Sequence, residues 1–529
     1  MTPGESMNTI SDVLVIGGGG SGLCAAISAA TSGATVTVLE KCERIGGSTG
    51  MSVGSFTAAG TSYQYRAGVN DSTDFFIEDM KTANGADEAR ENQELRRVLA
   101  EHAGPTVEWL SSIGVQFLGP TPEPPYEKPR MHNVLPNSKA YITALARECR
   151  KRGVAIVTSA RVEKLLRNAA GEIIGARARG VDYLGRRGVI LATGDYSAAA
   201  DMKRAYVGEA AAKVQAVNPN NTGDGFRLGG DVGGVMLQMD RLYEGLRFAP
   251  ANLPDPIKLL PSHPAVSRAM RLVVERLPKK LLAVVLRGAL TSWVGPNNTM
   301  YAAGAILVDP DGRRVANEDS DKELARGVAA GSNQAYMVFD AALARKFSAW
   351  PHPVSTFPGV AYAYVQDYKS YRPDMYHEGA TLEELAAKAG IDAHGLARTV
   401  EAFRGYASAG RDPEFGRTRF GSGIGEGPYY ALGPMNAYIT LADGGLAVDT
   451  DLRVTEAGGT PIPGLWAAGS TGQGGLQLLN HGLHIGWAMV SGRIAGRNVA
   501  YALPREDLTP FGDTTSVLEL PLDRLEVVR

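Results

Sequence analysis

The stretch DVLVIGGGGSGLCAAISAATSGATVTVLEKCERIGGST, residues 12–49, decides the fold of this chain. A hydrophobic strand at residues 13–16 leads into Gly17-x-Gly19-x-x-Gly22, an alanine-rich helix and a second strand that ends at Glu40. Glycines at this spacing let a pyrophosphate approach the helix N-terminus, whose free N–H groups and dipole favour negative charge. A carboxylate that closes the second strand accepts hydrogen bonds from ribose hydroxyls. The stretch therefore predicts a dinucleotide-binding βαβ unit.

A second glycine turn distinguishes between the two common dinucleotides. The segment KCERIGGST, residues 41–49, follows Glu40 directly. FAD enzymes place a loop here that returns to the pyrophosphate and the flavin. An NAD domain would continue with a further strand and helix. We therefore expect FAD.

Further motifs extend over nearly the whole chain and resemble one flavoprotein family, that of the fumarate reductases and 3-ketosteroid dehydrogenases. They are GGSTGMSVGSFTAAGT (46–61), ILATGDYS (190–197), NTGDG (221–225), ILVDPDGRRVANE (306–318), TLEELAAKAGID (381–392) and PIPGLWAAGS (461–470). The resemblance implies an α/β fold, with a discontinuous Rossmann-like FAD-binding domain and an inserted α+β capping domain. It places the FAD-binding domain at residues 9–240 and 428–505, the cap at 241–427 and a C-terminal tail at 506–529.

The resemblance also implies a set of FAD contacts. Binding is expected to be non-covalent, because residues 48–52 contain no histidine that could carry the flavin. The helix N-terminus at residues 483–485 is expected to face flavin N1 and O2. The full set is Gly17, Gly19, Gly20, Ser21, Gly22, Glu40, Lys41, Gly46, Gly47, Ser48, Thr49, Gly54, Val162, Ala192, Thr193, Gly194, Asp224, Gly469, Ser470, Leu483, His484 and Ile485.

The substrate side departs from the fumarate reductases. Their cap arginine is matched by Lys322, and residues 474–485 contain no arginine at all. Burying a dianion without guanidinium partners is expensive. We therefore expect an uncharged, apolar chamber lined by Leu476, Leu478 and Leu479.

Four side chains are the main candidates for proton transfer: Tyr301, Lys322, Tyr438 and His481. His484, for which a cofactor or structural contact is the favoured role, and Tyr126 are less favoured candidates. A tyrosine binds a carbonyl as a donor and removes a proton once ionised, and burial can lower the pKa of a lysine into a useful range. Each candidate has a simpler alternative, a packed aromatic ring for the tyrosines and a solvated surface position for the lysine. By similarity to the ketosteroid dehydrogenases, the backbone N–H of Gly482 could bind a substrate carbonyl.

The sequence thus predicts an FAD-dependent oxidoreductase that acts on a CH–CH bond beside a carbonyl, with an apolar cyclic ketone such as a 3-ketosteroid or terpenoid as substrate. One alternative is an enoate reductase or dehydrogenase with Lys322 or Arg326 as counter-ion. Another is a flavin-binding electron-transfer subunit without its own substrate. An external electron acceptor or donor is expected, because no haem motif or second nucleotide fingerprint is present.

Composition limits the remaining possibilities. A chain of 529 residues needs more than one core, and a net charge of -2 gives no reason to expect a nucleic-acid partner. Three cysteines without CxxC or metal-ligand spacing, and an N-terminus unlike a signal peptide, favour a cytoplasmic protein without a metal site. Residues 257–290 are basic and aliphatic, which suits a peripheral membrane contact, a lid over the active site, or a surface helix pair.

Overall fold

The computed structural model describes residues 9–250, 259–278, 287–288, 290–291, 295–296, 298–357 and 361–528. A central sheet has the order β20-β21-β9-β1-β2-β6, and all of its neighbouring pairs except β20-β21 are parallel. Residues 13–16 of β1 are buried, as expected for a parallel strand covered on both faces. The bounds are β1 (Thr9–Ile16), β2 (Val36–Leu39), β6 (Ala155–Val157), β9 (Val181–Leu191), β20 (Arg453–Thr455) and β21 (Pro461–Ala467).

Helix α1 (Gly20–Thr31) packs against the last helix, α19 (Leu483–Ala500), so that the two ends of the FAD-binding domain meet. Glycines permit this close approach. A Cβ atom on Gly492 would lie 2.3 Å from the carbonyl oxygen of Ser21, and one on Gly496 would lie 2.1 Å from that of Ala25. The alternating pattern of residues 154–180 predicts a β-meander. β7 (Val162–Arg167) and β8 (Ile173–Ala178) form it with β9, whereas β6 of the same segment pairs parallel with β2.

Other elements complete this domain. A small sheet of β3 (Ser55–Thr57), β4 (Gln116–Thr121) and β5 (Met131–Leu135) lies beside the cavity described below. The helices are α2 (Gly47–Met51), α3 (Ser62–Arg66), α4 (Thr73–Asn84), η1 (Gly85–Arg90), α5 (Gln93–Ser112), α6 (Lys139–Lys151), α7 (Ala200–Tyr206), α8 (Glu209–Lys213), α9 (Asp224–Asp231) and η2 (Gly469–Gly472).

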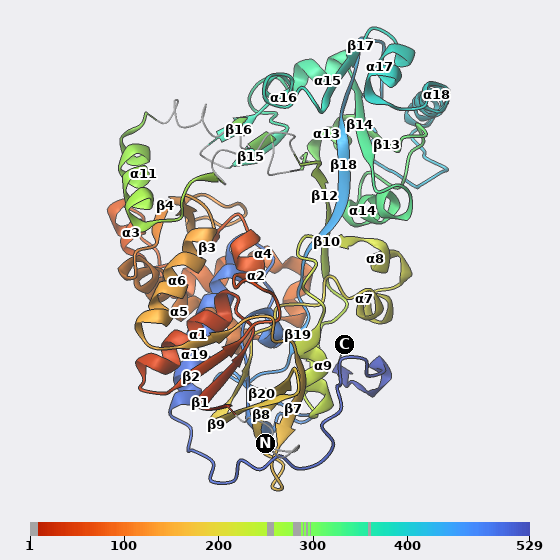
Figure 1. Cartoon of the computed structure of the whole chain (residues 1–529). Helices are drawn as coiled ribbons and strands as arrows, with labels where there is room; N and C mark the ends of the chain where they lie inside the picture. Colours follow the sequence, from red (N-terminus) through yellow and green to blue (C-terminus); the bar gives the residue numbers. More distant parts are fainter. Residues whose placement is uncertain are drawn as a thin grey trace.

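The cap lies above one end of this domain (Figure 1) and is built on a six-stranded sheet. Its strands are β10 (Gln215–Ala216), β12 (Leu242–Phe248), β13 (Ile306–Val308), β14 (Ala335–Asp340), β17 (Tyr376–Gly379) and β18 (Tyr429–Ala442). β10 and β18 lie on the FAD side of the predicted boundaries at 240 and 428, yet they pair within this sheet. The long β18 therefore links the two domains.

Helices cover the cap sheet, whose two hydrophobic cores are distinct from that of the FAD-binding domain. Amphipathic patterns at residues 381–389 and 396–406 predict two cap helices, which correspond to α17 (Leu382–Ala389) and α18 (Ala393–Ala409). The other cap elements are α13 (Thr299–Ala303), α14 (Asp321–Ala330), α15 (Ala341–Lys346), α16 (Val365–Tyr371), β15 (Ser355–Phe357) and β16 (Ala361–Ala363).

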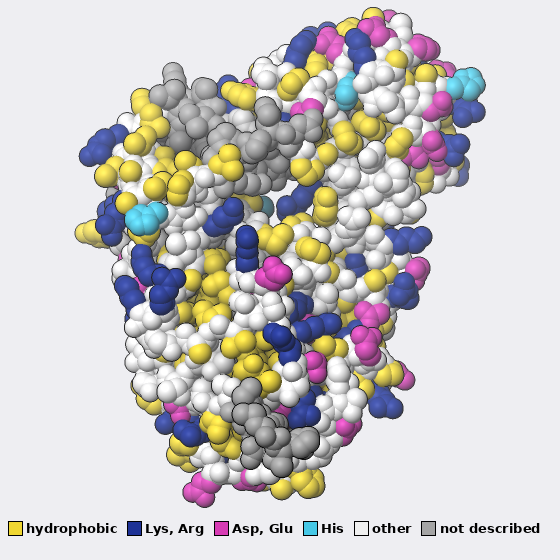
Figure 2. Space-filling view, viewed as in Figure 1, with side chains coloured by type: hydrophobic (Ala, Val, Ile, Leu, Met, Phe, Trp, Pro, Cys, Tyr) yellow, Lys and Arg dark blue, Asp and Glu magenta, His cyan; other side chains and the backbone are white. Residues whose placement is uncertain are grey.

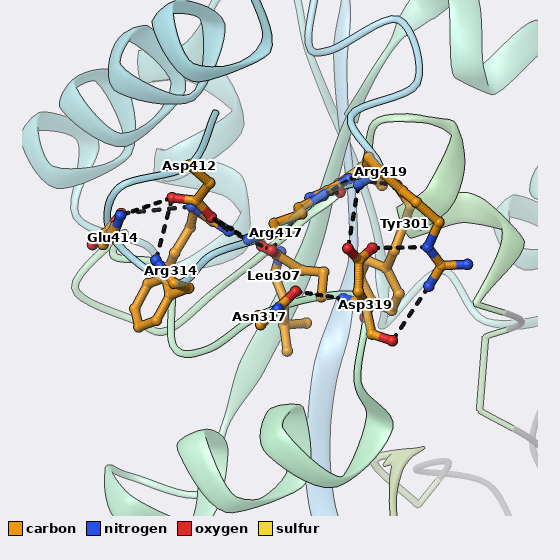
Figure 3. A network of polar contacts seen from close by, with 12 residues as sticks. Tyr301, Leu307, Arg314, Asn317, Asp319, Asp412, Glu414, Arg417 and Arg419 are labelled. Atoms are coloured by element: carbon orange, nitrogen blue, oxygen red, sulfur yellow. Dashed lines mark hydrogen bonds and ion pairs between the residues drawn. The ribbon is translucent and has the colours of Figure 1, made fainter. Parts of the chain in front are cut away.

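A network of buried charges joins three segments of the cap (Figure 3). Arg314 contacts Glu318 at 2.5 Å and Asp412 at 2.8 Å, and Arg417 lies 3.3 Å from Glu318. Arg417 also donates to the backbone carbonyls of Ala305 and Tyr301. Since each buried charge has partners, this network holds the cap together.

The tail after residue 505 folds back onto the FAD-binding domain. Val517 and Leu525 are buried in its core, and β22 (Val527–Val528) pairs with β11 (Met236–Leu237), which in turn pairs with β19 (Gly445–Leu446). The last short helix is η3 (Leu522–Arg524). The tail is therefore a packed arm of this domain.

The basic and aliphatic segment at 257–290 is only partly described, because Lys258, Lys279, Lys280 and the run LLAVVL lie outside the described residues. Its described part contains α11 (Pro264–Arg276), on which Leu272 and Val273 are 45% and 56% exposed. No helix in the described ranges is long and apolar enough to cross a membrane. Contact with a membrane surface stays a prediction.

Candidate functional site

A cavity of about 740 Å³ extends from the carboxyl ends of β1, β2 and β9 to the cap strand β12. Figure 2 shows the surface hollowed where the FAD-binding domain meets the cap, with basic side chains at the rim. A crevice at the carboxyl ends of parallel strands is the usual ligand site of such sheets.

The glycine fingerprint forms one wall of this cavity. Gly17 has a φ of +110°, and a Cβ there would lie 2.2 Å from the carbonyl oxygen of Ala192. A Cβ on Gly22 would lie 1.9 Å from the carbonyl oxygen of Gly17, so this glycine closes the turn. A Cβ on Gly19 would meet nothing within 4 Å, because this residue borders the open cavity. The wall thus fits a pyrophosphate at the N-terminus of α1.

Charged groups surround the nucleotide end. The carboxylate of Glu40 accepts hydrogen bonds from the backbone N–H groups of Gly18 at 2.7 Å and Cys42 at 2.8 Å, which fix it at the cavity wall. Asp224 contacts Lys41 at 3.1 Å and Arg161 at 2.9 Å. Burial alone would raise the pKa of Asp224, but the hydrogen bond from Arg161 and the two cations lower it overall. Asp224 therefore stays ionised.

Most of the residues expected to contact FAD line this one cavity. Four of them are not among the lining residues: Gly22, Gly46, Gly469 and Leu483. These can support the wall from behind, as the backbone N–H of Gly46 does by donating to the carbonyl oxygen of Gly18 at 2.9 Å. The lining members are Gly17, Gly19, Gly20, Ser21, Glu40, Lys41, Gly47, Ser48, Thr49, Gly54, Val162, Ala192, Thr193, Gly194, Asp224, Ser470, His484 and Ile485.

The N-terminus of α19 borders the cavity at the end that also contains Arg247 of β12. This part of the cavity is called the substrate end below. Gly482, the residue before this helix, has a φ of +81°, and a Cβ there would lie 2.7 Å from the backbone nitrogen of Thr57. No described group accepts a hydrogen bond from the backbone N–H of Gly482. The first N–H groups of a helix lack internal partners. This segment can therefore donate to a carbonyl oxygen or to an electron-rich ring edge.

Three of the four proton-transfer candidates lie outside the cavity lining. Tyr301 is 1% exposed within the cap core, beside Glu318 and Arg417, and burial raises its pKa far above the ordinary value. Lys322 is exposed on α14. Tyr438 is half-buried on β18, close enough to Arg247 to interact with its charge. None of the three lines the cavity, and their part in proton transfer stays a prediction.

His481 is the candidate that the structure brings to the cavity. It lines the substrate end, with its side chain 79% exposed, and its Nδ1 lies 2.5 Å from Oε1 of Glu123. The hydrogen bond and charge of Glu123 raise the pKa of His481, and the charge of Arg247 opposes this rise.

The expectation of an uncharged chamber is wrong. Leu478 and Leu479 line the cavity as expected, whereas Leu476 is buried behind it, and Arg247 of β12 lines the same end. Arg247 donates to Oγ1 of Thr440 at 3.2 Å and pairs with no described carboxylate. The counter-ion suggested from the sequence, Arg326, instead binds the buried Glu244 at 2.7 Å.

Several functional contacts were not apparent in the sequence. Asn218 and Asn221 donate to Oγ of Ser48 at 2.8 and 3.1 Å and fix the start of α2 after the second glycine turn. Glu123 and Arg247 reach the site from segments that carry no motif. Only the alternating pattern of LYEGLRF at 242–248, a strand with one arginine, could have drawn attention to Arg247.

Comparison with known proteins identifies the class. Residues 12–483 match the family described as FAD binding domain, so the chain belongs to that family. It is 27% identical over 500 residues to a probable fumarate reductase of Shewanella frigidimarina, covering 92% of this chain and 74% of the relative. It is 25% identical to a 4-oxocyclohexanecarboxylate 2-dehydrogenase of Sinomonas cyclohexanicum, covering 92% of each.

Solved structures agree with this assignment. The open conformation of a flavocytochrome c3 fumarate reductase matches with a TM-score of 0.68 and 25% identity, over 93% of this chain and 78% of that one. A 3-ketosteroid delta1-dehydrogenase from Sterolibacterium denitrificans shares the fold, with a TM-score of 0.63 and 21% identity over 93% and 99% of the two chains. The protein is an FAD-dependent oxidoreductase that acts on carbon–carbon double bonds.

Proposed function

We propose that this enzyme reduces, or forms, a carbon–carbon double bond conjugated to a carbonyl in a mainly apolar substrate that carries one carboxylate. Arg247 is the observation that carries the proposal. A partly buried guanidinium without a carboxylate partner among the described residues favours an anion in the cavity.

The remaining lining supports an apolar skeleton beside that anion. Leu246, Leu441, Leu478 and Leu479 surround the end at which Arg247 lies. A single arginine suits one carboxylate better than two, and two relatives named for monocarboxylates, a urocanate reductase of Eggerthella lenta and the 4-oxocyclohexanecarboxylate 2-dehydrogenase, fit this class.

Different residues of the chain would bind the cofactor and the substrate. The glycine fingerprint and Glu40 would hold FAD, which supplies hydride transfer when bound. Arg247 would anchor the carboxylate, and the N–H of Gly482 would bind the carbonyl oxygen and stabilise the charge that develops there. An external donor or acceptor would exchange electrons with the enzyme.

A second candidate is a neutral cyclic enone such as a ketosteroid, which the leucine lining also favours. The test is anaerobic reoxidation of the photoreduced holoenzyme by matched pairs of unsaturated rings with and without a carboxylate. We expect the carboxylated member to react faster, and Arg247→Ala to abolish this preference by raising KM at least tenfold. Arg44→Ala, at the nucleotide end of the cavity, is the control. Equal rates for both members would favour the neutral enone.

A further inference from the structure

The pair formed by Glu123 and His481 stands out among the titratable groups at the cavity. Glu123 lies in the loop after β4 and is 7% exposed, whereas His481 precedes α19 and borders the cavity. The two side chains, 358 positions apart in the sequence, meet at 2.5 Å between Oε1 and Nδ1. The carboxylate thereby fixes the ring.

The backbone of His481 is held as well. Its carbonyl oxygen accepts a hydrogen bond of 2.7 Å from Oγ1 of Thr57. With Nδ1 bound to Glu123, the free ring nitrogen is Nε2, for which no described group is a partner. A ring fixed at one nitrogen and open at the other is the arrangement by which a carboxylate orients an acid–base histidine.

The charges around this ring have opposite effects. Glu123 raises the pKa of His481 through its hydrogen bond and charge, while the cation Arg247 lowers it. The net effect is upward, so the imidazolium form extends to higher pH. The imidazolium of His481 in turn stabilises the buried carboxylate of Glu123, so that the charged form of each side chain favours the charged form of the other.

The geometry points to a proton-transfer dyad, in which His481 exchanges a proton with the substrate and Glu123 is its positioning residue. This inference rests on the proposed function. In the reducing direction bound, reduced FAD would supply the hydride for one alkene carbon. His481 would give the proton for the other: its Nε2–H bond breaks as a C–H bond forms at the carbon beside the carbonyl. The neutral ring then regains a proton from water, to which 79% of its side chain is exposed. Oxidation runs the same steps backward.

The first test needs no substrate. In holoenzyme labelled at histidine Cε1, NMR follows the titration of each of the eight histidines, and His481→Gln assigns the relevant signal. We expect the pKa of His481 to fall in Glu123→Gln and to recover in part in Glu123→Asp. An unchanged titration in Glu123→Gln would overturn the dyad.

The second test measures turnover. Reoxidation of the reduced holoenzyme by the carboxylated enone should decline as pH rises through the pKa of His481, and the decline should move to lower pH in Glu123→Gln. His481→Gln should lose about 10²- to 10⁴-fold in rate while binding the substrate normally. A His481→Gln enzyme with full activity would overturn the proton-transfer role. If no compound of the panel reacts, the substrate class is wrong, and the NMR titration still decides whether the dyad exists.

Discussion

Lys322 and Arg326 lie about one turn apart on α14 and have different surroundings. Lys322 is exposed, whereas Arg326 donates twice to Glu244, whose side chain is fully buried. We predict that Lys322→Ala leaves both turnover and stability unchanged. Arg326→Ala leaves a buried carboxylate without its main partner and should cost about 3 kcal/mol of unfolding free energy. Urea denaturation of the two variants checks this, and equal midpoints would contradict it.

Glu91 makes stability depend on pH. Its side chain is fully buried, and burial raises its pKa to about 7, against the hydrogen bonds from the N–H of Gln477 and from Asn84 and the charge of Arg96. The folded state therefore holds a proton that the unfolded state releases near its ordinary pKa of 4.5. This contribution is complete below that pKa and is lost as pH rises through 7, by roughly 3 kcal/mol.

We predict that Glu91→Gln loses less stability between pH 5 and pH 8 than the parent protein. Thermal unfolding at both pH values measures the difference. Glu94→Gln is the control, since Glu94 is a nearby carboxylate that is exposed in the first turn of α5. Parallel pH profiles for the parent and Glu91→Gln would show that this carboxyl is ionised throughout.

At the scale of elements, the packing of α1 against α19 depends on backbone contact that only glycine allows. We predict that Gly496→Ala lowers the midpoint of thermal unfolding, because its Cβ would lie 2.1 Å from the carbonyl oxygen of Ala25. Gly405→Ala in α18 is the matched control, because a Cβ there meets nothing within 4 Å. That exchange should stabilise the helix by about 0.5–1 kcal/mol. A tolerated Gly496→Ala would mean that the helices can separate without loss.

The elements also show how far sequence reasoning reaches. The glycine fingerprint, β2 and Glu40 are adjacent in the chain, so their geometry followed from local rules, and so did the meander and the helices α17 and α18. Arg247 and Glu123 lie far from any motif, and only the tertiary fold brings them to the cavity. The long β18 lies wholly beyond the predicted boundary at 428, yet its pairing within the cap sheet continues to residue 442.

At the scale of the whole molecule, FAD binding should stabilise the FAD-binding domain more than the cap. The hydrophobic core of the FAD-binding domain is separate from the two cap cores. Most residues that line the cavity belong to the FAD-binding domain. A ligand that binds only the folded state stabilises it by about 2.7 kcal/mol at 100 times its Kd. We predict that calorimetry resolves two transitions and that FAD raises only the one of the FAD-binding domain. Arg314→Met, which breaks the buried network of the cap, should lower only the other. A single transition that moves as a whole in both experiments would mean that β12 and β18 couple the domains into one cooperative unit.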